Sequence, residues 1–328
     1  MAVGTITETL NSLYTTTWAK RRAGIVDQVF EANRLLTAIK SKGMIKFEPT
    51  EGRRLEIPLR ISRPGTSKFF SKGATFTISN FDPLTVAYDT WKNFGDQLVR
   101  YWEDDKINGS NKVAHLKLMN AKIDTLKDDL DLGLETALWA DTGGSSVPDY
   151  NGLQYLIDNS PSTSVTVHGI NQATQTDGQG NFIWRNQQVT SGGVFSVFGE
   201  SDMTNIYNTC SRWGKTDLLI SPQAIYELGE AEALDRVRIV NKEAVDLGLD
   251  HITFKGKMWI WSPKCPSGNT YFIDRAHYGF SVDPSVNFTM GPWKNIPNQY
   301  EDVVTQIVQR GQSWVDKRQC HGVLTAQT

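Results

Sequence analysis

The sequence has few cysteines, and none of them is spaced for pairing. Cys210, Cys265 and Cys320 are the only three among 328 residues, and they lie far apart without any C-x-x-C pair. The spacing therefore predicts neither a disulfide framework nor a zinc site. A reducing compartment fits this cysteine usage, and we expect the protein to be made in the cytoplasm.

The sequence also lacks a targeting segment and a long apolar run. Met1 is not followed by a basic region and an apolar stretch, and nowhere do about 18 apolar residues occur in succession. We therefore expect no export signal and no membrane partner.

An excess of positive charge is missing as well. The 34 lysines and arginines are matched by 36 aspartates and glutamates, which gives a net charge of −2. Tight binding of nucleic acid requires clustered excess cation, so this composition predicts weak contact with DNA at most.

No catalytic or cofactor motif is complete. Gly214-Lys215-Thr216 resembles the end of a phosphate-binding loop, but Thr209 stands where the first glycine belongs. The loop 177–181 has oxygen ligands without the spacing of a calcium loop. The histidines fit neither a triad nor a metal motif, and they are His115, His168, His251, His277 and His321. We expect no enzyme, no cofactor and no metal.

What the sequence does contain is one long helix at 111–141. Apolar side chains recur there at steps of three and four, which places them on one stripe with charged residues outside it. Gly143 and Gly144 follow as stop signals. The stripe consists of Val113, Leu116, Met119, Ile123, Leu126, Leu130, Leu134 and Ala137. This spine helix has one side to bury, and few compact enzymes need such a rod.

An extended β-hairpin is predicted at 44–92. Leu55, Ile57 and Leu59 alternate with polar residues, and the stretch 84–89 also alternates, which is the two-residue period of strands. A turn-rich tip lies between them at 63–73. A two-stranded projection of this length is marginally stable by itself, so we expect it to lie on a partner.

The charges of the hairpin and the helix are opposite. Residues 42–72 carry eight basic and three acidic side chains, whereas residues 101–141 carry five basic and nine acidic ones. The basic hairpin therefore suits the acidic spine of a neighbouring subunit. The alternative is that each element simply presents a solvated charged face.

The remaining chain mixes helices and strands without a regular β-α-β repeat, which predicts an α+β fold. Residues 1–24 have no amphipathic period and suggest an arm, followed by a short helix at 25–39. Ser201 is a candidate cap for one helix, and Pro222 begins another that ends at Leu234. Strands are expected at 218–220, 251–254, 257–261, 271–273, 302–315 and 319–325.

The order of these parts resembles the tailed-bacteriophage major capsid proteins, the Hong Kong phage-type fold. Gly169-Ile170-Asn171-Gln172-Ala173-Thr174, followed by Trp184-Arg185-Asn186, is similar to a family segment that reads Gly-Ile-x-Arg-Ala-Thr and then Trp-Arg-Asn. Gln172 departs from that pattern, since the family usually has arginine there. Further similar stretches are 217–221, 254–257, 266–273 and 298–302.

The resemblance implies four parts. These are an N-terminal arm with its short helix (1–43), an extended loop (44–92), a peripheral domain with the spine helix (93–160 and 290–328) and an axial domain (161–289). The loop 235–250 would line the axis of a capsomer. The contacts expected between subunits involve Trp18, Arg53, Arg54, Arg60, Arg63, Lys68, Phe69, Phe70, Lys72, Asp124, Asp128, Asp131 and Arg238.

The implied function is a major capsid protein that forms hexamers and pentamers around double-stranded DNA in a virion, assembled in the host cytoplasm. The implied partners are a portal, possible decoration proteins and a separate scaffolding protein, because little chain precedes the hairpin. Some relatives join a loop lysine to an asparagine. Lys68 or Lys72 and Asn295 or Asn298 are placed for that bond, but we do not expect it.

Three other readings stay open from the sequence. A nanocompartment shell resembles the same fold and would enclose an enzyme instead of DNA. A tail-tube or decoration protein is a second alternative, although a long spine helix is unusual in a tube. An enzyme of unknown substrate is the third, and it would require a pocket with converging titratable groups.

Overall fold

The computed structural model describes residues 35, 38, 45–47, 54–61, 67–75, 84–103, 112–177, 180–234 and 252–328. Predictions for Trp18, the arm, the loop tip 62–66 and the axis loop with Arg238 lie outside these residues. Of the predicted helix at 25–39, Leu35 and Ala38 are described, and both are helical and buried. In the described part, no helix is long and apolar enough to cross a membrane.

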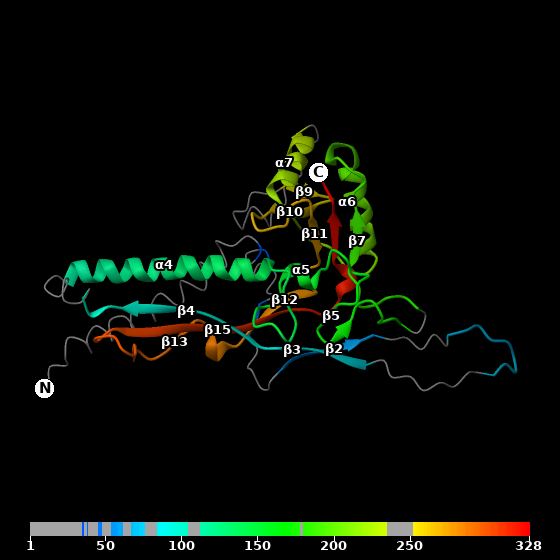
Figure 1. Cartoon of the computed structure of the whole chain (residues 1–328). Coiled ribbons are helices and arrows are strands. Elements are labelled where there is room, and N and C mark those ends of the chain that lie inside the picture. The colour runs from blue at the N-terminus through cyan, green and yellow to red at the C-terminus, as the bar shows by residue number, and fades with distance from the viewer. Residues whose placement is uncertain are drawn as a thin grey trace.

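The longest strand, β15 (Val303–Val315), organises a six-stranded sheet, called here the β15 sheet. It pairs antiparallel with β4 (Lys92–Arg100) along the whole of β4, and beyond that with β12 (Tyr278–Val282). The short strands of this sheet are β1 (Ile45–Phe47), β13 (Thr289–Met290) and β14 (Lys294–Asn295). The 3-10 helix η1 (Pro284–Val286) follows β12. The sheet is long and narrow (Figure 1).

The spine helix α4 (Lys112–Trp139) lies along this sheet, as Figure 1 shows. Its predicted stripe is buried at Ile123, Leu126, Leu130 and Leu134, which are each at most 4% exposed, and half-buried at Ala137. They pack with Leu98 of β4, Phe280 of β12 and Ile307 of β15 in the main hydrophobic core. The helix is therefore held by one apolar face, as its period predicts.

A second six-stranded sheet, called here the β8 sheet, stands above one end of the first (Figure 1). Its strands lie in the order β7-β16-β11-β8-β10-β9. Their bounds are β7 (Gln187–Thr190), β8 (Leu218–Ser221), β9 (Ile252–Phe254), β10 (Lys257–Trp261), β11 (Thr270–Ile273) and β16 (Gly322–Thr325). Both faces are covered, since Leu218 and Ile220 join the main core while Leu219 joins a second cluster.

Two helices supply that second cluster. They are α6 (Phe195–Ser211), which buries Met203 and Ile206, and α7 (Gln223–Leu234). The expectation that Ser201 caps a helix is wrong. Helix α6 already begins at Phe195, where Phe195 packs with Trp259, and Ser201 Oγ instead donates to Phe198 O at 2.9 Å inside the helix.

The chain crosses between the two sheets more than once. Strand β11 belongs to the β8 sheet and β12 to the β15 sheet, and the end of β15 leads through η2 (Arg318–Cys320) into β16. The predicted domain boundaries stay predictions. Strand pairing places β12 beside β15 in one sheet and β16 beside β11 in the other.

The burial of α4 yields a matched pair of substitutions. Leu134→Ala should lower the free energy of unfolding by about 2–5 kcal/mol, since Leu134 is fully buried and the change leaves a cavity. Leu132→Ala on the same helix should change it by less than about 0.5 kcal/mol, because Leu132 is 57% exposed. Urea denaturation of both variants measures the difference. Equal losses would mean that α4 does not bury this stripe.

Candidate assembly surface

The predicted hairpin consists of β2 (Arg54–Arg60) and β3 (Leu84–Thr90). They pair antiparallel from Arg54 opposite Thr90 to Arg60 opposite Leu84. The ribbon leaves the body beside the β8 sheet and extends away from it (Figure 1). Its inner face packs Leu59 and Ala87 against Ile170 and Trp184.

The outer face of β3 has an unusual composition. Leu84, Val86 and Tyr88 are 70%, 47% and 38% exposed, while Ala87 and Asp89 on the inner face are buried. A strand with one solvated side normally turns its apolar residues inward. Here the alternation is inverted, so the hairpin presents an apolar stripe to its surroundings.

Basic groups border this stripe. The guanidinium carbon of Arg54 lies 4.7 Å from the ring centre of Tyr88, and Arg60 is opposite Leu84 in the register. Glu56 is opposite Tyr88 and Pro58 is opposite Val86, and both are exposed on the same face. We call the exposed set of Arg54, Glu56, Pro58, Arg60, Leu84, Val86 and Tyr88 the hairpin outer face. A partner that covers it needs apolar contact area and negative charge.

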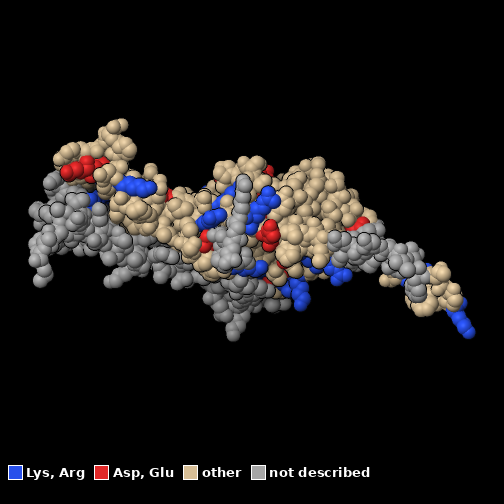
Figure 2. Space-filling view, turned by 90° about the horizontal axis from the view of Figure 1, so that it is seen from below, with Lys and Arg blue, Asp and Glu red and all other residues tan. Residues whose placement is uncertain are grey.

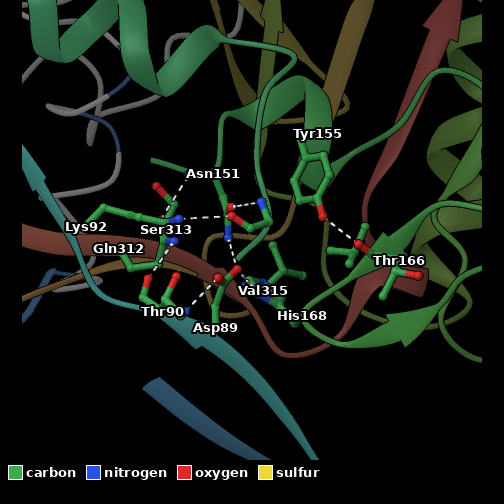
Figure 3. Close-up of polar contacts among 12 residues, drawn as sticks. Asp89, Thr90, Lys92, Asn151, Tyr155, Thr166, His168, Gln312, Ser313 and Val315 are labelled. Carbon is green, nitrogen blue, oxygen red and sulfur yellow. Dashed lines mark hydrogen bonds and ion pairs between the residues drawn. The ribbon is translucent and has the colours of Figure 1, made fainter. Parts of the chain in front are cut away.

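The base of the hairpin is fixed by the buried carboxylate of Asp89 (Figure 3). Asn151 Nδ2 donates to Asp89 Oδ2 at 2.5 Å, and His168 Nδ1 lies 3.3 Å from the same oxygen. The Val315 N–H donates to His168 Nε2 at 3.3 Å, so Nδ1 carries the ring proton and donates to Asp89. The carboxylate thus connects β3, the segment after α4 and the end of β15.

The side chains of Gln312 and Lys92 extend this network into the sheet. Gln312 Nε2 donates to Thr90 O, and its Oε1 accepts from the Asn151 and Ser313 N–H groups (Figure 3). Lys92 is buried, and its ammonium donates to Gly144 O and Val147 O. Gln312 thus connects β15 to the end of β3 and to the segment after α4, and Lys92 connects β4 to that segment, which fixes the hairpin base.

A tight turn also supports the hairpin. His168 and Gly169 join β5 (Thr166–Val167) to β6 (Ile170–Asn171), and both have positive φ, at 51° and 77°. Two such residues form the turn that matches strand twist. A Cβ on Gly169 would lie 2.7 Å from the Tyr88 ring, so only glycine lets the turn contact β3 this closely.

The far end of the hairpin is polar and aromatic. Phe69 is fully exposed and Phe70 is 64% exposed, while Lys68 Nζ donates to Thr75 O at 2.6 Å. Figure 2 shows basic side chains at this outermost point, and the basic residues in the described stretch 67–75 are Lys68 and Lys72.

A second aromatic patch lies near the start of β15, at the opposite end of the molecule from the hairpin. Trp102 and Tyr300 make an edge contact with ring centres 5.3 Å apart, and Tyr101 beside them is half exposed. The Trp102 N–H donates to Asp302 Oδ1 at 2.9 Å, which anchors the patch to the chain just before β15. Exposed apolar groups thus lie at both ends of a long subunit.

The predicted contact residues are distributed unevenly. Arg54, Arg60, Lys68, Phe69, Phe70 and Lys72 all belong to the described hairpin, and all are exposed. Asp124, Asp128 and Asp131 lie on α4, but their side chains are not described. Arg53, Arg63, Trp18 and Arg238 lie outside the described residues. The sequence reasoning did not single out Leu84, Val86 and Tyr88 as contacts, because alternation alone does not say which face of a strand is outward.

The guanidinium of Arg318, in the η2 crossing between β15 and β16, holds a second buried polar network. It donates to Leu156 O of α5 (Leu153–Leu156), to Gln172 Oε1 at 2.7 Å, to Trp184 O and to Asn186 Oδ1. Burial lowers the pKa of Arg318 to about 10, which still leaves it charged at neutral pH. This contact explains why residue 172 is glutamine. An arginine at that position would place a second guanidinium beside that of Arg318.

No protein-family model and no curated protein sequence matches the chain. Solved structures do match it over most of its length. A capsid subunit of cyanophage A-1(L) is 12% identical with a TM-score of 0.59, covering 88% of this chain and 93% of that one. The capsid of a native GTA particle is 11% identical with a TM-score of 0.54, covering 88% and 90%.

The holo-SrpI encapsulin complex from Synechococcus elongatus is also similar, at 10% identity and a TM-score of 0.52, covering 88% of this chain and 87% of that one. Each of these likenesses covers 88% of the chain. The chain has the Hong Kong phage-type capsid fold, as its sequence resemblance implied.

The Asp89 network predicts a defined acid response. Burial alone would raise the pKa of Asp89, but hydrogen bonds from His168, Asn151 and the Thr90 N–H together lower it below the ordinary value. A lowered pKa means that ionised Asp89 stabilises the fold above the ordinary value near 3.9, and that this is lost as the pH falls through the folded value.

We therefore expect Asp89→Asn to lower the free energy of unfolding by about 1–3 kcal/mol at pH 7, because an amide donor would face the groups that now donate to Asp89. The difference from wild type should shrink below pH 4. Asp129→Asn, on the exposed face of α4, is the control and should change little. Urea melts between pH 7 and pH 3 measure both, and a constant difference across that range would contradict the assignment.

Proposed function

We propose that this chain is a major capsid protein that assembles as hexamers and pentamers into a closed shell. The observation that carries the proposal is the hairpin outer face, an apolar stripe with basic borders on a two-stranded projection. The capsid fold supports it, because the matching subunits come from assembled particles. The proposed role is structural and not enzymatic.

The energetics favour a partner on this face. Removing apolar surface from water contributes roughly 25 cal/mol of stabilisation for each Å² buried. In the isolated chain, Leu84 is 70% and Val86 47% exposed. A two-stranded ribbon gains little from its own contacts. A neighbouring subunit that covers the hairpin would bury the apolar stripe. The Asp89 network would hold the hairpin in the orientation that this contact needs.

We propose that the neighbour's spine helix supplies the matching charge. Arg54, Arg60, Lys68 and Lys72 with Arg53 and Arg63 would face Asp124, Asp128 and Asp131 of the next subunit, with Phe69 and Phe70 as apolar anchors. Such charges set register and partner choice more than affinity. Trp18 and Arg238 are proposed as further contacts, from the arm and around the capsomer axis.

The proposed contents are double-stranded DNA. A net charge of −2 suits a container that touches DNA weakly, since tight phosphate binding would need an excess of cations. A portal, decoration proteins and a separate scaffolding protein are the proposed partners, in a virion assembled in the host cytoplasm. A P4 procapsid of similar fold includes a size determination protein, an example of a second protein in such a particle.

A nanocompartment shell is the second candidate, because an encapsulin has the same fold with a TM-score of 0.52. The two differ in what the shell encloses. A capsid would hold nuclease-protected DNA, whereas a nanocompartment would hold a protein cargo.

Val86→Glu should prevent the formation of rings and shells while leaving the subunit folded. The change places a charge at the centre of the hairpin outer face without touching the core, and it also opposes the acidic partner surface. Val86→Thr, of similar shape and uncharged, is the matched control and should still assemble. Size-exclusion chromatography with negative-stain microscopy reads out assembly, and circular dichroism reads out folding. Shells formed by Val86→Glu at wild-type yield would remove the hairpin from the interface.

Expression with and without the scaffolding protein encoded beside it tests the wider proposal. Closed shells should be uniform only with the partner, and particles from infected cells should contain DNA that survives external nuclease. Uniform shells from this chain alone would contradict a separate scaffold. A monomer under every condition would contradict the shell, and an enclosed enzyme without DNA would favour the nanocompartment.

A further inference from the structure

Three side chains from distant parts of the sequence meet between the two sheets. Asp274 and His277 lie in the turn between β11 and β12, and Cys320 is the last residue of η2. A carboxylate oxygen, a ring nitrogen and the sulfur of these residues lie within 4.8 Å of one another. We propose that they form a binding site for a divalent zinc ion.

The donor set fits that metal. Thiolate and imidazole ligands favour zinc and related late transition metals over magnesium and calcium, which prefer oxygen alone. Carboxylate and thiolate together carry two negative charges, which a divalent ion neutralises. Tetrahedral zinc brings its ligand atoms to roughly 3.3–3.8 Å from one another, so side-chain movements of about an ångström would close the site.

The surrounding groups hold the three ligands in place. Asp316 Oδ1 lies 2.8 Å from His277 Nδ1, so a metal on the remaining ring nitrogen would complete a carboxylate–histidine–metal arrangement. Asp274 Oδ2 accepts from the Lys215 N–H at 2.8 Å, and its Oδ1 accepts from the Ala276 N–H. The Cys320 thiol donates to Lys317 O at 2.8 Å, and the metal would take the place of that proton.

The ring of His321 holds the backbone of the turn at 274–277. Its Nδ1 accepts from the Asp274 N–H at 3.3 Å, and its Nε2 lies 3.3 Å from His277 O. Both of its ring nitrogens therefore contact the backbone of the two ligand residues. Gly214 packs against the site so closely that a Cβ there would lie 2.5 Å from the Cys320 Cβ.

The place of the site explains what a metal would do. The turn at 274–277 and the segment at 316–321 are both crossings of the chain between the β8 sheet and the β15 sheet. A metal joined to both would fasten one crossing to the other and fix the angle between the sheets. Three protein ligands leave one position open, and the His277 side chain is 32% exposed, so solvent can fill that position.

The test uses the full chain after chelator treatment, titrated with Co²⁺ as a spectroscopic substitute for Zn²⁺. We expect one cobalt ion per chain, with the near-ultraviolet band of thiolate-to-cobalt charge transfer and the visible bands of four-coordination. Cys320→Ser should remove the charge-transfer band, and His277→Ala should weaken binding at least tenfold. Cys265→Ser, at another buried cysteine outside the cluster, should keep both properties. Mg²⁺ should not compete.

Thermal melts keep the test decisive if Cys320→Ser folds poorly. Zn²⁺ should raise the melting temperature of wild type and of Cys265→Ser but not of His277→Ala, whose partly exposed side chain can be removed without opening the core. A wild type without stoichiometric binding, or a charge-transfer band that persists in Cys320→Ser, would overturn the proposal. Microscopy of the same samples reports assembly separately, so the outcome does not depend on the proposed shell.

Discussion

The buried guanidinium of Arg318 fixes the place where the chain crosses from β15 of one sheet to β16 of the other. A buried cation is costly unless its hydrogen bonds are satisfied, and here carbonyl and amide oxygens from three segments accept them. Those segments are α5, the β6 end at Gln172, and the stretch that contains Trp184 and Asn186. The crossing from β15 to β16 therefore cannot move away from these segments without leaving a buried charge without partners.

The hairpin also depends on a fixed attachment to the body. A ribbon that extends from the body can position a neighbour only if its base is fixed, and the Asp89, His168 and Asn151 contacts fix it. The same strand then inverts its pattern, with a carboxylate inside and Leu84 and Val86 outside. A polar residue on the inner face and apolar residues on the outer face are unfavourable for an isolated subunit. They are favourable for a subunit whose outer face is covered by another chain.

Much of this fold could be predicted from sequence where one face is apolar. The apolar period of the spine helix is buried at Ile123, Leu126, Leu130 and Leu134, and the strand expected at 302–315 is close to the observed bounds of β15, Val303–Val315. Strand β4 was missed because it mixes Lys92, Asn93, Gly95 and Gln97 with few apolar residues. Its position is set by its pairing with β15. The two strands are so close at Gly95 that a Cβ there would lie 2.4 Å from Ile307 O. The start of α6 was misplaced because a cap-forming serine is a weaker signal than the packing of Phe195.

The cluster of Asp274, His277 and Cys320 shows why sites of this kind escape sequence patterns. Metal motifs are recognised when ligands follow one another along a helix or a loop, whereas here a gap of more than forty residues separates Cys320 from the others. The ligands meet because the chain crosses between its sheets twice at one place. The Arg318 hydrogen bonds and this cluster lie on the same short segment, 316–321, and act on the same angle. A metal there would therefore reinforce the restraint that the Arg318 hydrogen bonds already impose on segment 316–321. A change in that restraint would also change the orientation of the hairpin.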